Sequence, residues 1–342
     1  MKALVLEAYN KFDFKDVANP VISDDEVLVE VKAVGICGSD VHGMDGSTGR
    51  RIPPIIMGHE ASGRIITAGN NVVQWKPGDR VTFDSTIYKL DDWFTLNGHY
   101  NLSDNRMVLG VSCTEFKRDG AFAQYVAIPQ HILHRIPENV TYEQAALVEP
   151  VAVALHAVNL SGIKLNDTAV VFGAGMIGLF IIQLLKQAGC TVIAVDILDE
   201  KLEMAKKAGA DVILNSKSDD ILCQIRKHSN NRGADIAFEA VGISVTINTA
   251  ISSLRKGGTL VLVGNLSPSI DFPLQKVVTG EITVKGSCAI NGEYPAVLEL
   301  ISKGKVDVDS MISNVVPLSE GEKYFNKLYS KEPGLLKVIL KP

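Results

Sequence analysis

Cysteine is scarce in this chain, and its few cysteines do not form a disulfide pattern. The 342 residues contain five cysteines, an odd number spread from Cys37 to Cys288. Small secreted domains that depend on disulfides carry closely spaced cysteines in even numbers. The cysteine content therefore excludes a disulfide scaffold and predicts a cytoplasmic protein with free thiols.

Two further absences exclude whole classes of function. The chain has no uninterrupted apolar stretch of the roughly 18 residues that a membrane-spanning helix needs. Its first ten residues, MKALVLEAYN, have too few apolar side chains for a signal-peptide core. It also lacks an excess of positive charge, since 34 basic residues stand against 39 acidic ones. We therefore expect neither a membrane nor a nucleic acid as a partner.

The length and the hydrophobic pattern predict two domains of different class. Residues 1 to about 135 contain short strand-like segments such as EVLVEVKAV, separated by turn signals such as KPGD, which predicts a compact, barrel-like all-β module. From about residue 142, near-continuous apolar segments such as TAVVFGAG and TVIAVD alternate with helical segments. Because this alternation is typical of a parallel sheet covered on both faces, the second domain is predicted to be doubly wound α/β.

The segment GAGMIG carries the glycine spacing of a dinucleotide-binding loop. Gly173, Gly175 and Gly178 follow the strand-like AVVF and open a helical segment. In such a loop the first glycine permits a tight turn, the second lets the backbone approach a pyrophosphate, and the third lets helix and strand pack closely. A purely structural turn is the alternative, because this motif alone is weakly specific.

Asp196 favours NAD as the dinucleotide. It ends the next predicted strand, and it follows the glycine motif at close to the roughly 20 residues that separate this motif from the carboxylate that binds the ribose hydroxyls. Its charge would repel the 2′-phosphate of NADP, and a helix cap is the alternative role. The predicted cofactor-binding residues are Gly173, Gly175, Met176, Ile177, Gly178, Asp196, Lys201, Val241 and Gly242.

Four residues of metal-binding type are scattered through the chain. Cys37 lies in VGICGSDVHG, His59 and Glu60 in MGHE, and Glu149 in LVEPVAVALHA. A thiolate, an imidazole and carboxylates are ligands that suit zinc, and a catalytic zinc uses three protein ligands and one open position. Taken singly, Cys37 is more often a core thiol and His59 an ordinary hydrogen-bonded histidine. The spacing alone leaves the question open.

In their order along the chain, GICGSDVH, MGHE, VEPVAVALHA and GAGMIG followed by Asp196 resemble the zinc-dependent medium-chain dehydrogenases, and most of all the sorbitol (polyol) dehydrogenase branch. The resemblance implies a GroES-like β-barrel catalytic domain at 1–145 and 286–342 and a Rossmann NAD-binding domain at 146–285. It implies one catalytic zinc per chain, NAD as cofactor and a homodimer or homotetramer. The zinc ligands that it implies are Cys37, His59, Glu60 and Glu149, the last two directly or through water.

The resemblance also implies a path for the proton of the alcohol. Ser39 would accept the proton and pass it through the cofactor ribose to His42, which exchanges protons with solvent. Asp40 would orient His59 from behind. The structural alternatives are a turn residue for Ser39, a surface side chain for His42, and a bond from Asp40 to its own backbone. The predicted catalytic residues are Ser39, His42, Glu60 and Glu149.

The sequence departs from the family at two places, and two loop arginines add a further candidate site. Many members hold a structural zinc with four cysteines, and the matching positions here carry no thiol, so no structural zinc is expected: Lys89, Asp92, Thr95 and Ser103. Ala289 and Ile290 stand where sorbitol dehydrogenases have an arginine and a tyrosine, which predicts an apolar substrate wall and a substrate other than sorbitol. Arg50 and Arg51 are candidate ligands of an anionic group, with solvated loop arginines as the more common case.

The leading hypothesis is a dehydrogenase that transfers hydride between NAD and a secondary hydroxyl of a polyol or sugar derivative, with zinc polarising the alcohol oxygen. An L-threonine 3-dehydrogenase or butanediol dehydrogenase is the neighbouring possibility, supported by GAFAQYVAIP. A hypothesis from a different class is that the chain is a metal-free NAD-binding protein, and the missing lobe cysteines support this hypothesis.

Overall fold

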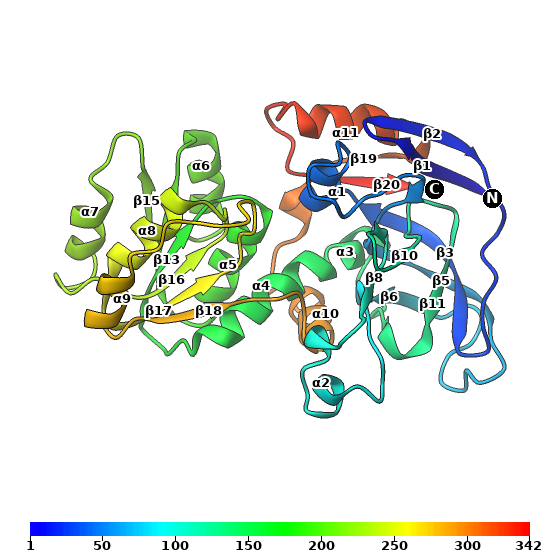
Figure 1. The fold of residues 1–342 in the computed structure, drawn as a ribbon, viewed down its shortest axis with the longest axis horizontal. Coiled ribbons are helices and arrows are strands. Elements are labelled where there is room, and N and C mark those ends of the chain that lie inside the picture. Colours follow the sequence, from blue (N-terminus) through cyan, green and yellow to red (C-terminus); the bar gives the residue numbers. More distant parts are fainter. The chain divides into compact units, whose positions relative to one another are not determined.

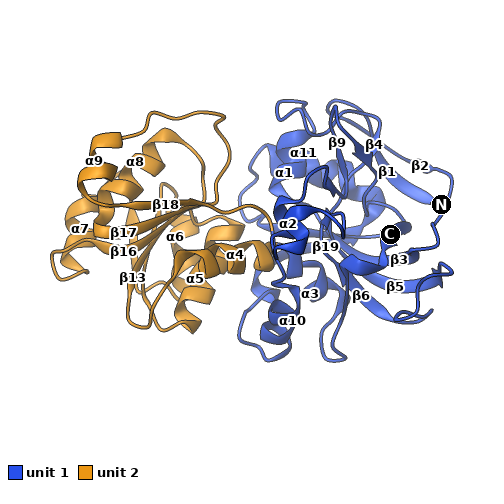
Figure 2. Ribbon diagram, turned by 60° about the horizontal axis from the view of Figure 1, so that its bottom comes forward, with its two compact units in different colours: residues 1–149, 290–342 blue, residues 150–289 orange.

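The chain divides into two units in the computed structural model, which describes residues 1–342. Unit 1 consists of residues 1–149 and 290–342, and unit 2 of residues 150–289 (Figure 2). Both ends of the chain therefore belong to unit 1. The boundaries inferred from the sequence, after residue 145 and before residue 286, stay a prediction of where the family's two domains meet.

Unit 1 is built around strand β3 (Glu26–Gly35) of a seven-stranded sheet. This strand pairs antiparallel with β5 (Glu60–Ala68), with β11 (Tyr125–Pro129) and, at its end, with β20 (Lys337–Lys341). Alternate side chains of β3 are buried, as the pleat of a strand requires. The blue β3 and the red β20 of Figure 1 therefore lie side by side although they are far apart in sequence.

Shorter elements complete unit 1. Its other strands are β1 (Lys2–Ala8), β2 (Lys11–Asp16), β4 (Ile55–Ile56), β6 (Arg80–Phe83), β7 (Thr86–Ile87), β8 (Met107–Val108), β9 (Val111–Ser112), β10 (Lys117–Arg118), β12 (Leu133–Arg135) and β19 (Ile312–Pro317). Its helices are α1 (Gly38–Gly43), α2 (Trp93–Leu96), α3 (Tyr142–Ala146), α10 (Tyr294–Ser302) and α11 (Gly321–Tyr329). The segment after residue 285 thus adds two strands and two helices, and the sequence pattern did not predict α11.

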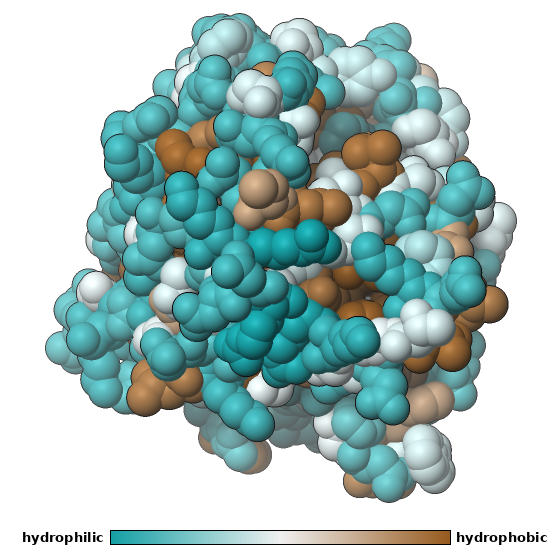
Figure 3. Space-filling model, turned by 90° about the vertical axis from the view of Figure 1, so that its left-hand side faces the viewer, coloured by the Kyte–Doolittle hydropathy of each residue, from teal (hydrophilic) through white to brown (hydrophobic).

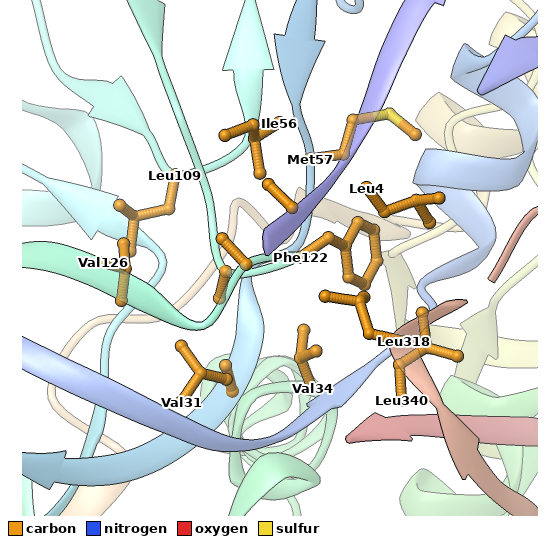
Figure 4. Close-up of a cluster of buried hydrophobic side chains, with 14 of the residues drawn as sticks. Leu4, Val31, Val34, Ile56, Met57, Leu109, Phe122, Val126, Leu318 and Leu340 are labelled. Atoms are coloured by element: carbon orange, nitrogen blue, oxygen red, sulfur yellow. The ribbon is translucent and has the colours of Figure 1, made fainter. Parts of the chain in front are cut away.

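The core of unit 1 gathers apolar side chains from both ends of the chain. Leu4, Phe122, Leu318 and Leu340 are at most 1% exposed and converge in Figure 4. Burial of such side chains contributes about 1.5–3 kcal/mol each. The C-terminal segment is therefore an integral part of unit 1.

Unit 2 is a parallel sheet of six strands in the order β15-β14-β13-β16-β17-β18. The strands are β13 (Thr168–Phe172), β14 (Thr191–Asp196), β15 (Val212–Asn215), β16 (Ala234–Glu239), β17 (Leu254–Leu262) and β18 (Thr283–Gly286). The helices are α5 (Met176–Gln187), α6 (Asp199–Lys207), α7 (Ile221–Lys227), α8 (Ser244–Ser253) and α9 (Leu274–Thr279), with α4 (Val148–Ser161) leading into the unit. Numbered within the unit, the order is 3-2-1-4-5-6, that of a dinucleotide-binding fold with its switch point between β13 and β16. The predicted doubly wound domain is confirmed.

Hydrophilic residues cover most of one face of the molecule (Figure 3). The face drawn in Figure 3 is mostly hydrophilic, and its hydrophobic residues lie in small separate groups. No helix of the chain combines the length and the apolar character needed to cross a bilayer.

Candidate metal centre and nucleotide loop

Cys37, His59 and Glu60 come together at one end of the unit 1 sheet. Each offers one ligand atom, and these atoms all lie within 4.8 Å of one another. The strand register explains the meeting, because Gly35 at the end of β3 pairs with Glu60 at the start of β5. A side chain at position 35 would collide with the Glu60 carboxylate, since an added Cβ would lie 2.5 Å from Oε2.

His59 lies against Asp40. Nδ1 of His59 and Oδ2 of Asp40 are 3.5 Å apart, both residues are buried, and neither atom has a hydrogen-bond partner. Because a carboxylate can only accept, a proton on Nδ1 would point at Oδ2 of Asp40 and would leave Nε2 as the nitrogen available to a metal. The geometry supports the orienting role expected for Asp40.

Arg51 is neither a solvated loop residue nor available to an outside anion, which corrects the two interpretations of the sequence. Its side chain is 4% exposed and donates from Nε and Nη2 to Oδ1 of Asp40, at 3.1 and 2.7 Å. The physical reason is the buried carboxylate of Asp40, which needs a cation beside it. Arg50 is exposed, in agreement with a solvated position.

Glu60 is paired with a lysine that the sequence analysis missed. Nζ of Lys337, on β20, contacts Oε2 of Glu60 and donates to the carbonyl oxygen of Ile36 at 3.0 Å. Burial lowers the pKa of Lys337, but the charges of Glu60 and Cys37 outweigh it and raise that pKa overall. Lys337 is therefore a cation beneath the cluster. A lysine inside the apolar segment LLKVILK, between Leu336 and Val338, was the available signal.

Glu149 is close to the cluster but is not one of the three grouped ligands. It lies in the first turn of α4, which only Leu147 separates from the end of α3. Its Oε1 accepts a hydrogen bond of 3.1 Å from Oγ of Ser85, a second residue that the sequence did not single out. Burial, with the nearby Glu60 charge, raises the pKa of Glu149 to about 7, although His59 opposes this.

The donor set fits a divalent cation. Burial, and then the charge of Glu60, raise the pKa of the Cys37 thiol above its usual value. Acidic groups held this close resist ionisation together unless a positive charge joins them. One sulfur, one imidazole nitrogen and carboxylate oxygen are the ligands of an open catalytic zinc site. A metal-binding histidine usually has a carboxylate beside its other ring nitrogen, and Oδ2 of Asp40 lies in that place next to Nδ1 of His59.

Ser39 and His42 lie on α1, directly after Cys37. Oγ of Ser39 is exposed and 3.2 Å from Sγ of Cys37, so this hydroxyl is at the cluster. His42 is exposed, in the last turn of α1. The exposed imidazole can exchange protons with water, as the predicted relay requires.

The lobe without cysteines is held by hydrogen bonds at the matching positions. The carboxylate of Asp92 accepts from the backbone N–H groups of residues 94 and 95 and, at 3.2 Å, from that of Asp104. Oγ of Ser103 accepts from the Lys89 N–H at 3.4 Å. These polar contacts connect the two sides of the lobe.

The predicted substrate wall needs one correction. Ile290 is 0% exposed, so its side chain belongs to the interior and offers no accessible apolar surface. Ala289 is half-buried and has a φ of +53°, a left-handed conformation that is uncommon for alanine.

The glycine loop of unit 2 has the geometry that its motif requires. Gly173 has a φ of +95°, and a Cβ on Gly178 would lie 1.9 Å from the Gly173 carbonyl oxygen. Gly175 caps α5, and a Cβ there would meet nothing within 4 Å, which leaves open space at the helix N-terminus. Met176 and Ile177 are the first residues of α5.

Asp196 ends β14 next to this loop. Its Oδ2 accepts a 2.8 Å hydrogen bond from Ala174, and its Oδ1 accepts from the two backbone N–H groups that follow it. Val241 faces Gly173, whose added Cβ would lie 2.7 Å from Cγ2 of Val241. Gly242 follows at a φ of +85°, and Lys201 lies on α6. Asp196 and Val241 thus lie next to the loop.

Two families match the chain, each over a different stretch. Residues 23–138 match the "Alcohol dehydrogenase GroES-like domain", and residues 177–303 match the "Zinc-binding dehydrogenase" family. The β-rich architecture of unit 1 and the parallel sheet of unit 2 agree with these matches, so the predicted GroES-like fold class is confirmed.

Two relatives with named activities and one solved structure extend the similarity over the whole chain. The D-arabitol-phosphate dehydrogenase of Enterococcus avium is 32% identical over 338 residues, which cover 97% of this chain and 94% of that protein. The sorbitol dehydrogenase of Bacillus subtilis is 33% identical over 348 residues, covering 100% and 97%. A zinc-binding dehydrogenase of Sinorhizobium meliloti, solved bound to NADP, has a TM-score of 0.91 and 30% identity and covers 100% of this chain and 99% of that one.

Proposed function

Because the chain belongs to the zinc-dependent medium-chain dehydrogenases, in their alcohol and polyol branch, we propose that it transfers hydride between NAD and a secondary hydroxyl of a polyol or sugar derivative. The observation that carries the proposal is the cluster of Cys37, His59 and Glu60, whose ligand atoms lie within 4.8 Å of one another. In this family a zinc ion and a nicotinamide cofactor do the chemistry.

Cys37, His59 and Glu60 would hold the zinc, with Glu149 as a further ligand directly or through water. The bound zinc supplies a positive charge that lowers the pKa of an alcohol oxygen, and the nicotinamide accepts the hydride. Lys337 contacts Oε2 of Glu60, which leaves Oε1 as the oxygen available to the metal. Ser39, exposed beside Cys37, would take the proton of the alcohol, and His42 would release it to water.

NAD is the proposed cofactor because of the charge of Asp196. The loop at 173–178 leaves room for a pyrophosphate, and Met176, Ile177, Lys201, Val241 and Gly242 complete the proposed nucleotide contacts. The Asp196 carboxylate already accepts backbone hydrogen bonds and is thereby fixed next to that loop. A 2′-phosphate placed there would meet this negative charge, so we propose that NADP binds less well.

Zinc analysis and a substrate panel test the proposal. The purified chain should contain close to one zinc, and NADH should form with polyols or polyol phosphates. Cys37→Ser should lose both zinc and turnover and keep NAD binding, whereas Cys113→Ser, which changes a half-buried thiol outside the cluster, should keep all three. A zinc-free chain that still binds NAD would support the metal-free binding protein, and turnover of threonine or butanediol alone would reject the polyol.

Three finer expectations accompany this function. We propose that the lobe binds no structural zinc, which a count of one zinc per chain would support. The homodimer or homotetramer stays a prediction, and the mass in solution measures it. The cytoplasmic location also stays a prediction; the five cysteines are all free thiols in the structure.

A further inference from the structure

Arg51 and Asp40 form a buried ion pair directly behind the proposed metal-binding histidine. Asp40 is 0% exposed and Arg51 is 4% exposed. Both hydrogen bonds of the pair end on one carboxylate oxygen, Oδ1, which receives Nε and Nη2 of Arg51. The other oxygen, Oδ2, is therefore left free, and it is the one that faces His59.

Oδ2 of Asp40 and the facing nitrogen of His59 both lack a hydrogen-bond partner. These two atoms, Oδ2 of Asp40 and Nδ1 of His59, are buried and lie 3.5 Å apart. A buried polar atom without a partner costs about 1–3 kcal/mol, and a hydrogen bond between these two atoms, which only this orientation allows, would remove that cost. A rotation of the Asp40 side chain would remove the acceptor from His59.

Hydrogen bonds that hold Arg51 in place prevent that rotation. Its Nη1 donates to the carbonyl oxygen of Arg50 at 2.9 Å, which fixes the plane of the guanidinium group. The backbone on either side is tied to Ser112, because Ile52 N–H donates to the Ser112 carbonyl oxygen and Ser112 N–H donates to that of Arg50.

Position 43 has no side chain because Arg51 fills the space. A Cβ on Gly43 would lie 2.5 Å from Cγ of Arg51. The same guanidinium group reaches forward, where Nη2 is 3.5 Å from Oγ of Ser39. Arg51 therefore joins the loop after α1 to two groups of the proposed centre.

We propose that Arg51 is a positioning residue of the metal centre: it holds Oδ1 of Asp40 so that Oδ2 receives the Nδ1 proton of His59 and Nε2 is presented to the metal. The proposal rests on the proposed zinc site. Substitution of a residue that orients a metal-binding histidine in this way lowers the metal affinity by about 10- to 100-fold.

Zinc affinity measured by competition with a chromophoric chelator tests the proposal without use of catalysis. Arg51→Met should raise the zinc dissociation constant by about 10- to 100-fold, and Arg51→Lys, which keeps a cation but loses the two-point hold, should raise it less. Arg50→Met removes the exposed neighbouring arginine and should leave the constant unchanged. The visible bands of the Co2+-loaded protein should shift in Arg51→Met and not in Arg50→Met.

A double variant separates positioning from packing. If Arg51 acts through Asp40, the loss in D40N/R51M should not exceed that of the weaker-binding single variant, since the two residues form one unit. This double variant also leaves no unpaired charge, so it should fold if Arg51→Met alone does not. Additive losses would overturn the proposal.

Two results distinguish the failure of this proposal from the failure of the proposed function. If Arg51→Lys and the double variant bind zinc as the parent does, with unchanged Co2+ bands, Arg51 is only a packing residue and the zinc enzyme stands. If the parent itself binds no zinc at the cluster, the proposed function fails first.

Discussion

Removal of the Lys337 ammonium should destabilise unit 1 strongly when no metal is bound. Lys337→Met leaves the Glu60 carboxylate, which is 1% exposed, without its cation. Breaking a buried ion pair by removing one partner costs about 3–5 kcal/mol. At about 2–4 °C per kcal/mol for a domain of this size, Tm should fall by roughly 6–20 °C.

Zinc should reverse part of this loss, because its positive charge would replace the missing lysine charge beside Glu60. Zinc at 100 times its dissociation constant stabilises a native protein by about 2.7 kcal/mol through mass action alone. At the same zinc concentration the gain should be larger in Lys337→Met than in the parent protein, since the Glu60 carboxylate then lacks the lysine charge and binds zinc more tightly. Thermal unfolding of chelator-treated and zinc-saturated protein, followed by circular dichroism, measures both effects.

A lysine on the same strand provides the matched control. Lys341 pairs with Glu143 at 2.7 Å, but its side chain is 51% exposed, and exposed pairs contribute about 0–1 kcal/mol. Lys341→Met should therefore change Tm little, and E60Q/K337M, which removes both buried charges, should recover much of the lost stability. Equal losses in the two lysine variants, or an equal zinc gain in Lys337→Met and the parent, would refute the argument.

Three further predictions follow from other residues. Burial raises the pKa of Glu149 from 4.5 to about 7. The protonated form therefore stabilises the metal-free protein below pH 4.5, and this contribution is lost as the pH rises through 7. Melting curves measured over this pH range should show a smaller fall in stability for Glu149→Gln. Asp196→Asn keeps an acceptor oxygen and removes the charge, so the ratio of kcat/KM for NAD over NADP should drop by about tenfold or more, as expected for a lost charged hydrogen bond; an unchanged ratio would show that another residue selects the cofactor. Asp92→Ala removes the acceptor of the lobe and should speed its cleavage by a protease without changing the zinc content, whereas Asp91→Ala, at the exposed neighbouring position, should not.

The local pattern of the chain was sufficient for the fold of unit 2. Strands buried on both faces, such as TAVVF and TVIAVD, and the glycines of GAGMIG are short-range signals, because strand burial and turn conformation are decided within a few residues. The C-terminal segment was harder. Helix α11 and the pairing of β20 with β3 depend on contacts with residues about 300 positions away, and a sequence pattern carries no record of such distances.

By itself the sequence determined which side chains a metal centre can use, since Cys37, His59 and Glu60 sit in motifs whose order resembles one enzyme family. Only the tertiary structure decided which charges accompany them. Arg51 looked like a loop residue and Lys337 like a strand residue, and both are buried against the carboxylates of the centre. The reason is physical: a buried carboxylate requires a cation within a few ångströms, and folding, not proximity in sequence, selects which cation arrives there.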